Sequence, residues 1–188
     1  MKRKSCETSD LNEECVSLNK NRIYFYSDIT KESCFNLIHK INEAKEYVKV
    51  HCELEQLIYL HICSDGGDLL SSLAVIDTIL NSEIKIITIC EGCVASAGVL
   101  VSLAGNERYM RKHSYMLIHE LRSSCYGKYT ECKDDMENND ILMKDMIKYI
   151  NKRCQNKNLE LNLEKFLKRD LLWNSKKCLK YGLITKIL

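Results

Sequence analysis

The sequence predicts a single domain of the α/β class, in which helices connect strands that run parallel. Strand-like and helix-like segments alternate through the first two-thirds of the chain. Runs dense in β-branched residues, as at 84–90, alternate with segments such as 69–81, whose apolar residues recur at helical spacing. A length of 188 residues is near the common size of one domain and is enough to bury a core.

These patterns place each element along the chain. Strands are expected at 22–26, 57–62, 84–90, 106–110, 114–119 and 183–187. Helices are expected at 31–47, 69–81, 96–104, 130–153, 161–168 and 175–181. Right-handed crossovers would join the parallel strands. The first 21 residues are more polar, so we expect a poorly ordered segment at 1–21 and one domain at 22–188.

Charge and hydropathy exclude several functional classes. The chain has 28 Lys and Arg against 26 Asp and Glu, interleaved, for a formal net charge of +2. This balance predicts no nucleic-acid surface. No apolar run approaches the ~18 residues of a membrane span, and no apolar stretch of a secretory leader follows the basic start. We expect a soluble intracellular protein in the cytoplasm, with an organelle not excluded.

Eleven cysteines are scattered singly along the chain, as buried small residues would be, and we expect reduced thiols. One pair, Cys90 and Cys93, forms a C-x-x-C motif. A zinc site would need a second pair of ligands, and Cys125 with Cys132 does not supply one at a customary spacing. We therefore expect no metal, and a redox role for the motif stays open as a hypothesis.

A serine among small residues is the most informative local feature. Gly92-Cys93-Val94-Ala95-Ser96-Ala97-Gly98 reads as a turn from a strand into a helix that begins at Ser96. Backbone N–H groups at a helix start are free to bind negative charge, so this turn can hold a nucleophile and part of an oxyanion hole. A plain helix cap is the alternative interpretation.

Two further segments carry residues of the same chemistry. Ile58-Tyr59-Leu60-His61-Ile62-Cys63-Ser64-Asp65-Gly66-Gly67 is a strand that leads into paired glycines, and Tyr115-Met116-Leu117-Ile118-His119 is a strand that ends in histidine. Paired glycines allow close approach to a ligand, and such a histidine can serve a neighbouring nucleophile. A tight turn and a surface imidazole are the alternatives.

The order and spacing of these segments resembles the ClpP family, the proteolytic subunits of Clp proteases. The resemblance extends through Lys168-Arg169-Asp170-Leu171-Leu172-Trp173 and Tyr181-Gly182-Leu183-Ile184, and covers roughly residues 22 to 188. It implies a ClpP/crotonase-like spiral of repeated βαβ units with a projecting helical handle at about 124–158. Asp65 replaces the family's proline, and Asp68 stands where the family is usually apolar or small.

The resemblance implies a serine endopeptidase with Ser96 as nucleophile, His119 as general base and Asp170 as the carboxylate that orients the imidazole. It implies an oxyanion hole made by the backbone N–H groups of Gly67 and Ala97. An extended substrate would lie between two segments, whose binding residues we expect to be Asp68, Leu69, Leu121 and Arg122.

The resemblance also implies an assembly. We expect a homo-oligomer of stacked heptameric rings, whose handles meet through a helical stripe of Met136, Leu142 or Met143, Met146, Ile147 and Ile150. Packing of this stripe within the subunit is the alternative. An AAA+ unfoldase would use ATP and deliver unfolded polypeptides, while this subunit would need no cofactor. The N-terminal segment 1–21 would lie near the ring axis.

Three other functions stay open at this point. A crotonase-fold acyl-CoA enzyme would also use paired N–H groups, but it leaves Ser96, His119 and Asp170 unexplained. A catalytically silent ring subunit would typically lack members of the triad. A Ser-Lys peptidase would need a lysine as base where this chain has His119.

Overall fold

The computed structural model describes residues 15–52 and 56–188. Most of the expected axial segment therefore lies outside the described residues. The part of it that is described contains β1 (Val16–Asn19), which the sequence did not predict. This strand pairs antiparallel with β2 (Arg22–Tyr26), across a turn in which Lys20 has a φ of 59°. Residues 16–19 are thus an ordered edge of the sheet.

The described strands form one eight-stranded sheet. Its main order is β1-β2-β3-β4-β5-β8, and the pairs from β2 to β8 are parallel. β6 pairs parallel with the end of β4, and β7 pairs antiparallel with β6. The remaining strands are β3 (Leu57–Ser64), β4 (Lys85–Ala95), β5 (Glu107–Met110), β6 (Tyr115–Leu117), β7 (Leu172–Asn174) and β8 (Lys186–Ile187).

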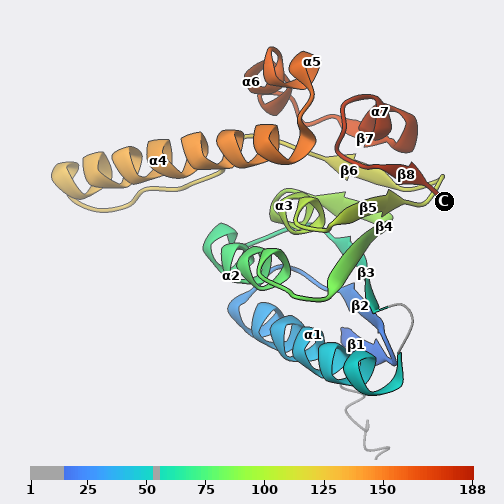
Figure 1. The fold of residues 1–188 in the computed structure, drawn as a ribbon. Coiled ribbons are helices and arrows are strands. Elements are labelled where there is room, and N and C mark those ends of the chain that lie inside the picture. Colours follow the sequence, from blue (N-terminus) through green and yellow to red (C-terminus); the bar gives the residue numbers. More distant parts are fainter. Residues whose placement is uncertain (1–14, 53–55) are drawn as a thin grey trace, which may run out of the picture.

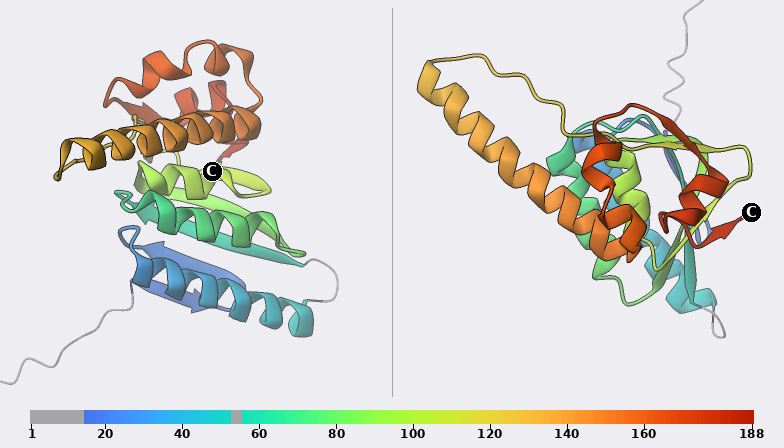
Figure 2. Two further views of the ribbon diagram at one scale, coloured as in Figure 1. Left: turned by 90° about the vertical axis from the view of Figure 1, so that its left-hand side faces the viewer. Right: turned by 90° about the horizontal axis from the view of Figure 1, so that it is seen from above.

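Helices connect the parallel strands and form a layer beside the sheet (Figure 1, Figure 2). Those that pack beside the early strands are α1 (Lys31–His51), α2 (Leu69–Leu80) and α3 (Ala97–Leu103). The long helix α4 (Tyr129–Cys154) projects from the body of the subunit, as Figure 2 shows from above. The C-terminal helices are α5 (Lys157–Glu160), α6 (Leu163–Leu167) and α7 (Ser175–Lys180).

The predicted α/β class and projecting helix are confirmed, with local differences. The helix expected at 161–168 is α6, and a separate short helix, α5, precedes it. The sequence did not predict β7, because three residues are too few to show a period. β4 continues to Ala95, past the expected end at residue 90, because its second half pairs with β6 instead of β5.

The core lies between the sheet and the helical layer. α1 buries Leu37, Ile41, Ala44 and Val48, which recur at spacings of three and four and so form one face of the helix. The central strand β4 buries five consecutive residues, 86–90, as a strand covered on both faces does. Burial of these apolar side chains is the main favourable contribution to folding.

A partly buried polar cluster joins β2, β3 and β4. The carboxylate of Glu91 accepts hydrogen bonds from the Tyr26 hydroxyl and from Nε of Arg111 at 2.8 Å, and contacts Nδ1 of His61 at 3.1 Å. Burial acts to raise the pKa of Glu91, but these hydrogen bonds outweigh it, and the pKa is lowered. The cluster therefore holds an ionised carboxylate between β2, β3 and the segment after β5.

One expectation about the cysteines is wrong. Cys125 and Cys132 form a disulfide with a Cα–Cα distance of 5.6 Å. Cys132 lies in the first turn of α4, and the chain before that helix folds back beside it, which brings the two sulfurs together. In the described part of the chain, no helix is both long and apolar enough to cross a membrane.

The first prediction concerns the start of α2, where Asp68 is the N-cap. Its carboxylate accepts from the N–H groups of Leu70 and Ser71 and from the Ser71 hydroxyl. Asp68→Ala should lower the free energy of unfolding by about 1 kcal/mol, whereas Asp68→Ser should retain most of it. Urea unfolding followed by circular dichroism measures both.

This stabilisation depends on pH with a defined sign. The hydrogen bond from Ser71 is the main cause that lowers the pKa of Asp68 below its ordinary value of 3.8. A carboxylate with a lowered pKa stabilises the fold above its unfolded pKa and loses that contribution as the pH falls through the folded pKa. The difference between wild type and Asp68→Ala should therefore shrink as the pH falls below about 4 and disappear only below the folded pKa, and a constant difference would contradict the capping role.

Candidate active site

Ser96 occupies a strained turn between β4 and α3. Its φ of 53° and ψ of −126° lie outside the regions that non-glycine residues favour. The Ser96 N–H donates to the carbonyl of Leu117 at 2.9 Å, which fixes the turn against β6. Although Ser96 is the N-cap of α3, its side chain makes no capping hydrogen bond. The hydroxyl is therefore not used for capping, and strain of this kind is typical of functional sites.

Gly66 and Gly67 allow the neighbouring loop to pass close to this turn. A Cβ at Gly66 would lie 2.6 Å from Cβ of Ser96 and 2.8 Å from the carbonyl oxygen of Ala95. A Cβ at Gly67 would lie 2.2 Å from the carbonyl oxygen of Ile29. Both glycines also have positive φ values, of 96° and 138°. Only glycine fits these two positions without displacement of the serine turn or the loop before α1.

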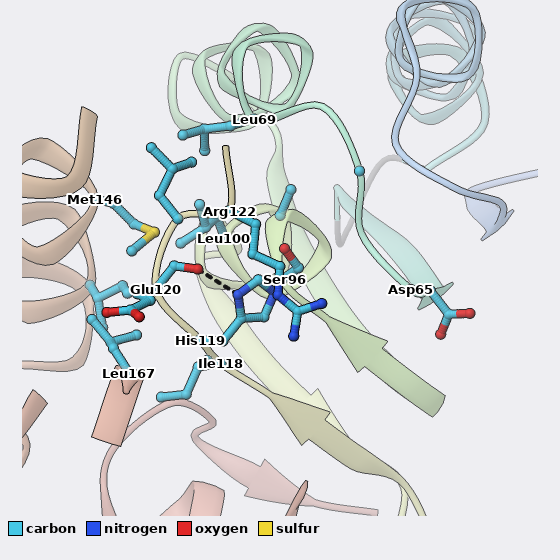
Figure 3. A pocket seen from close by; sticks show the side chains of 14 residues that line it. Asp65, Leu69, Ser96, Leu100, Ile118, His119, Glu120, Arg122, Met146 and Leu167 are labelled. Atoms are coloured by element: carbon cyan, nitrogen blue, oxygen red, sulfur yellow. Dashed lines mark hydrogen bonds between the residues drawn. The ribbon is translucent and has the colours of Figure 1, made fainter. Parts of the chain in front are cut away.

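A cavity of about 280 Å³ lies beside the serine turn (Figure 3). Its lining combines polar groups near Ser96 with apolar side chains from α3, α4 and α6. The lining residues are Asp65, Gly67, Leu69, Ser96, Ala97, Leu100, Ile118, His119, Glu120, Leu121, Arg122, Met146, Ile150 and Leu167. The structure thus brings together six of the predicted site residues besides Ser96: Gly67, Leu69, Ala97, His119, Leu121 and Arg122.

His119 follows β6 and faces the same cavity as Ser96. Its Nδ1 lies 2.5 Å from the carbonyl oxygen of Glu120. A carbonyl oxygen only accepts, so Nδ1 carries the proton and Nε2 presents a lone pair. This is the tautomer that a general base at Nε2 requires. Among the described residues, no hydrogen bond joins His119 to Ser96 or to Asp170.

Asp170 does not orient His119 in this conformation, contrary to the predicted geometry. Its Oδ2 instead forms a salt bridge with Nη2 of Arg122. The backbone nevertheless brings the two predicted partners together. β6 pairs with β7 in a register that sets Leu117 opposite Leu172, so two further steps along this antiparallel ladder would set His119 opposite Asp170. The ladder ends before that point.

The two predicted oxyanion donors lie on the cavity. Gly67 follows the loop that ends β3, and Ala97 is the first residue of α3. The first N–H groups of a helix have no partner within the helix, so the Ala97 N–H suits this role. The oxyanion hole stays a prediction, since it is defined by a reacting oxygen that would bind there.

Of the predicted groove residues, Asp68 is the one that the cavity lining does not include. Its carboxylate caps α2 and does not contribute to the cavity lining. Asp65 belongs to the lining, although its side chain points away from Ser96 (Figure 3). Sequence patterns could not separate these two carboxylates, because both adjoin the glycine pair.

Apolar side chains on one wall of the cavity were not predicted as site residues. Leu100, Met146, Ile150 and Leu167 line it from three different helices. Two of them, Met146 and Ile150, belong to the stripe expected on α4, so helical periodicity was the available signal. The part of α4 nearest the core thus packs within the subunit and closes the site.

The C-x-x-C pair beside the serine turn has little thiolate character. Burial raises the pKa of Cys90 to about 12 and also raises the pKa of Cys93. The thiolate is the reactive form and the form that binds metals, so protonated thiols disfavour both roles. Both cysteines are free, and the described residues include no cluster of His, Cys, Asp or Glu that could hold a metal ion.

Fold and cavity together define a class: α/β proteins with a serine at a strained strand-to-helix turn and a histidine on the same cavity. The family model described as Clp protease matches residues 9–188 of this chain. The chain therefore belongs to the Clp protease family, and the resemblance that its motifs indicated is confirmed.

Individual relatives agree with the family match. The chain is 32% identical over 135 residues to the "ATP-dependent Clp protease proteolytic subunit 3" of Synechococcus sp. (strain CC9902), and 31% identical to the subunit of the same description from strain CC9605. It is also 31% identical to a "proteolytic subunit 2" from Prochlorococcus marinus subsp. pastoris. Each match covers 70% of this chain and 66% of the relative, just under two thirds of its length.

The second prediction tests the contact between Gly66 and the serine turn. Gly66→Ala should slow the reaction of Ser96 with a fluorophosphonate at least tenfold, because the added methyl group must displace Cβ of Ser96. Gly127→Ala is a matched control, since the only close contact of its Cβ would be Oε2 of Glu131 at 2.5 Å, at the flexible end of a side chain. Equal reaction rates of Gly66→Ala and Gly127→Ala would show that the close approach is unimportant for the serine.

Proposed function

We propose that this chain is a serine endopeptidase subunit of a self-compartmentalising Clp-type protease, which hydrolyses unfolded polypeptides to short peptides. The observation that carries the proposal is the strained Ser96 turn, with a hydroxyl not used for capping on the cavity that His119 also lines. The tautomer of His119 supports the same role, because its Nε2 can accept a proton.

The mechanism follows the chemistry of these groups. Nε2 of His119 removes the proton as Oγ of Ser96 attacks the peptide carbonyl, and the N–H groups of Gly67 and Ala97 stabilise the oxyanion. His119 then protonates the leaving amine, and an acyl-enzyme remains. Water attacks the acyl-enzyme with His119 again as base, which releases the second peptide and restores Ser96.

Asp170 is the orienting carboxylate in this proposal. It would accept the hydrogen bond from Nδ1–H that the Glu120 carbonyl now accepts, and so would stabilise the imidazolium formed during attack. The register of β6 and β7 supports this assignment, since it directs the chain at Asp170 toward the chain at His119. A local rearrangement of side chains would complete the triad.

The substrate would bind as an extended strand beside residues 121–124. These residues have no regular structure, and Ser123 and Ser124 are exposed, so their backbone groups are open to a partner. Leu69 and Leu121 would form the two sides of the groove, both on the cavity. Main-chain hydrogen bonds would then supply much of the affinity, and side-chain specificity would be broad.

Assembly into stacked heptameric rings, with an AAA+ unfoldase that uses ATP, completes the proposal. The contact between rings would lie on the outer part of α4, where Met136 is 67% exposed and Ile141 is 57% exposed. Met146, Ile147 and Ile150 instead pack against the core of the subunit. Exposed apolar side chains on a projecting helix favour burial in an interface.

The third prediction tests the nucleophile. Ser96→Ala should reduce hydrolysis of a short fluorogenic peptide by about 10⁶ in turnover, because it removes the attacking oxygen and leaves assembly unchanged. Ser17→Ala, on the exposed face of β1, removes a hydroxyl far from the cavity and should retain full turnover. Retained hydrolysis by purified Ser96→Ala would refute the proposed mechanism.

The fourth prediction tests the contact between rings. Met136→Asp should split stacked rings into single rings or smaller species, because it would place an unpaired carboxylate in an apolar contact. Asn138→Asp adds the same charge at an exposed polar position of α4 and should leave the assembly intact. Light scattering coupled to gel filtration measures the mass. An equal effect of both variants would point to charge alone, and no effect of Met136→Asp would exclude this face.

A further inference from the structure

Arg122 binds the carboxylate that the proposed mechanism assigns to His119. Its Nη2 pairs with Oδ2 of Asp170, and Arg122 also lines the cavity that Ser96 and His119 share. Nδ1 of His119 meanwhile donates to the carbonyl of Glu120. In the proposed mechanism, His119 and Asp170 should bind one another. Instead, each is hydrogen-bonded to a residue of the segment after β6: His119 to Glu120, and Asp170 to Arg122.

The irregular path of this segment is what permits the ion pair. Residues 118–126 have no regular secondary structure. In an extended strand, side chains alternate between faces, so residues 119 and 122 would lie on opposite faces. Residues directly opposite across an antiparallel ladder share one face. If the β6–β7 ladder continued to His119 and Asp170, Asp170 would therefore share a face with His119 and not with Arg122.

From this geometry we propose that Arg122 is a positioning residue that holds Asp170 away from His119 in the unliganded subunit. A peptide that adds as a strand beside residues 121–124 extends this segment and turns Arg122 to the other face. Asp170 is then released to accept a hydrogen bond from Nδ1–H of His119. The inference rests on the proposed peptidase function and gives it a step in which substrate binding completes the triad.

The strength of the ion pair suits a contact that a substrate can break. The Arg122 side chain is 71% exposed and the Asp170 side chain is 52% exposed. Such exposed pairs are weak, so the pair would shift the equilibrium between the two arrangements by only about two- to fivefold. The subunit must leave the arrangement in which Arg122 pairs with Asp170 before the peptide binds. The pair therefore lowers the apparent affinity for the peptide by the same factor. Salt should weaken the pair further.

The kinetic test is Arg122→Gln, which removes the charge and keeps a polar side chain of similar length. With a short uncharged peptide, KM should fall about two- to fivefold and kcat should stay unchanged. Arg122→Lys should restore most of the wild-type KM. Lys128→Gln, at the N-cap of α4 just beyond this segment, removes a charge whose partner is Glu131 and should leave KM unaltered. An unchanged or raised KM in Arg122→Gln would overturn the inference.

The structural test does not depend on activity. In a crystal structure of Arg122→Gln without substrate, a carboxylate oxygen of Asp170 should lie within hydrogen-bond distance of Nδ1 of His119. A carboxylate that stays away from His119 would overturn the role of Arg122, even if the enzyme cleaves peptides. A released carboxylate in a protein that cleaves no peptide would refute the proposed function and leave the role of Arg122 standing.

Discussion

The close approach of the loop after β3 to the turn after β4 is the contact on which the site depends. A Cβ at Gly66 would lie 2.6 Å from Cβ of Ser96, so only glycine allows this loop to pass so close to the strained serine. Gly98, the second residue of α3, likewise lies close to Ser64 at the end of β3. Two adjacent parallel strands therefore end in a shared, closely packed junction, from which α3 begins.

A second constraint is the pairing of β6 with two different partners. β6 lies parallel to the end of β4, which sets His119 near the serine turn, and antiparallel to β7, which directs Asp170 toward the same place. Residues more than fifty positions apart are thus aligned by backbone hydrogen bonds. The β6–β7 ladder ends before it reaches His119 and Asp170, so backbone pairing does not decide which side chain binds Asp170. Small differences in free energy decide between its two possible partners, Arg122 and His119.

Local patterns predicted the features that depend on local structure. Small residues around Ser96 and the paired glycines indicated the turns, because close approach of two backbones excludes larger side chains. The resemblance to the family placed His119 on the same cavity, which periodicity alone could not do. The outer and inner parts of α4 looked alike in sequence, and only the path of the helix separates the exposed Met136 from the buried Ile150.

Some features depend on which of several partners a side chain binds, or on which distant segments the fold brings together. The sequence could not predict these features. Asp68 could face the substrate groove or cap α2, and only the structure shows that its carboxylate accepts from the first N–H groups of α2. The Cys125–Cys132 disulfide depends on how the chain folds back before α4. The ion pair of Asp170 with Arg122 joins residues 48 positions apart, and no pattern in the sequence favours it over a contact with His119.

The central claim is that Ser96 is the nucleophile of a cavity that binds extended peptides. Mass spectrometry of the intact chain after reaction with a peptidyl fluorophosphonate, followed by peptide mapping, tests it most directly. The predicted result is a single adduct on Ser96 that an excess of unlabelled peptide substrate prevents. An adduct on another residue, or a folded protein that remains unmodified, would contradict the claim.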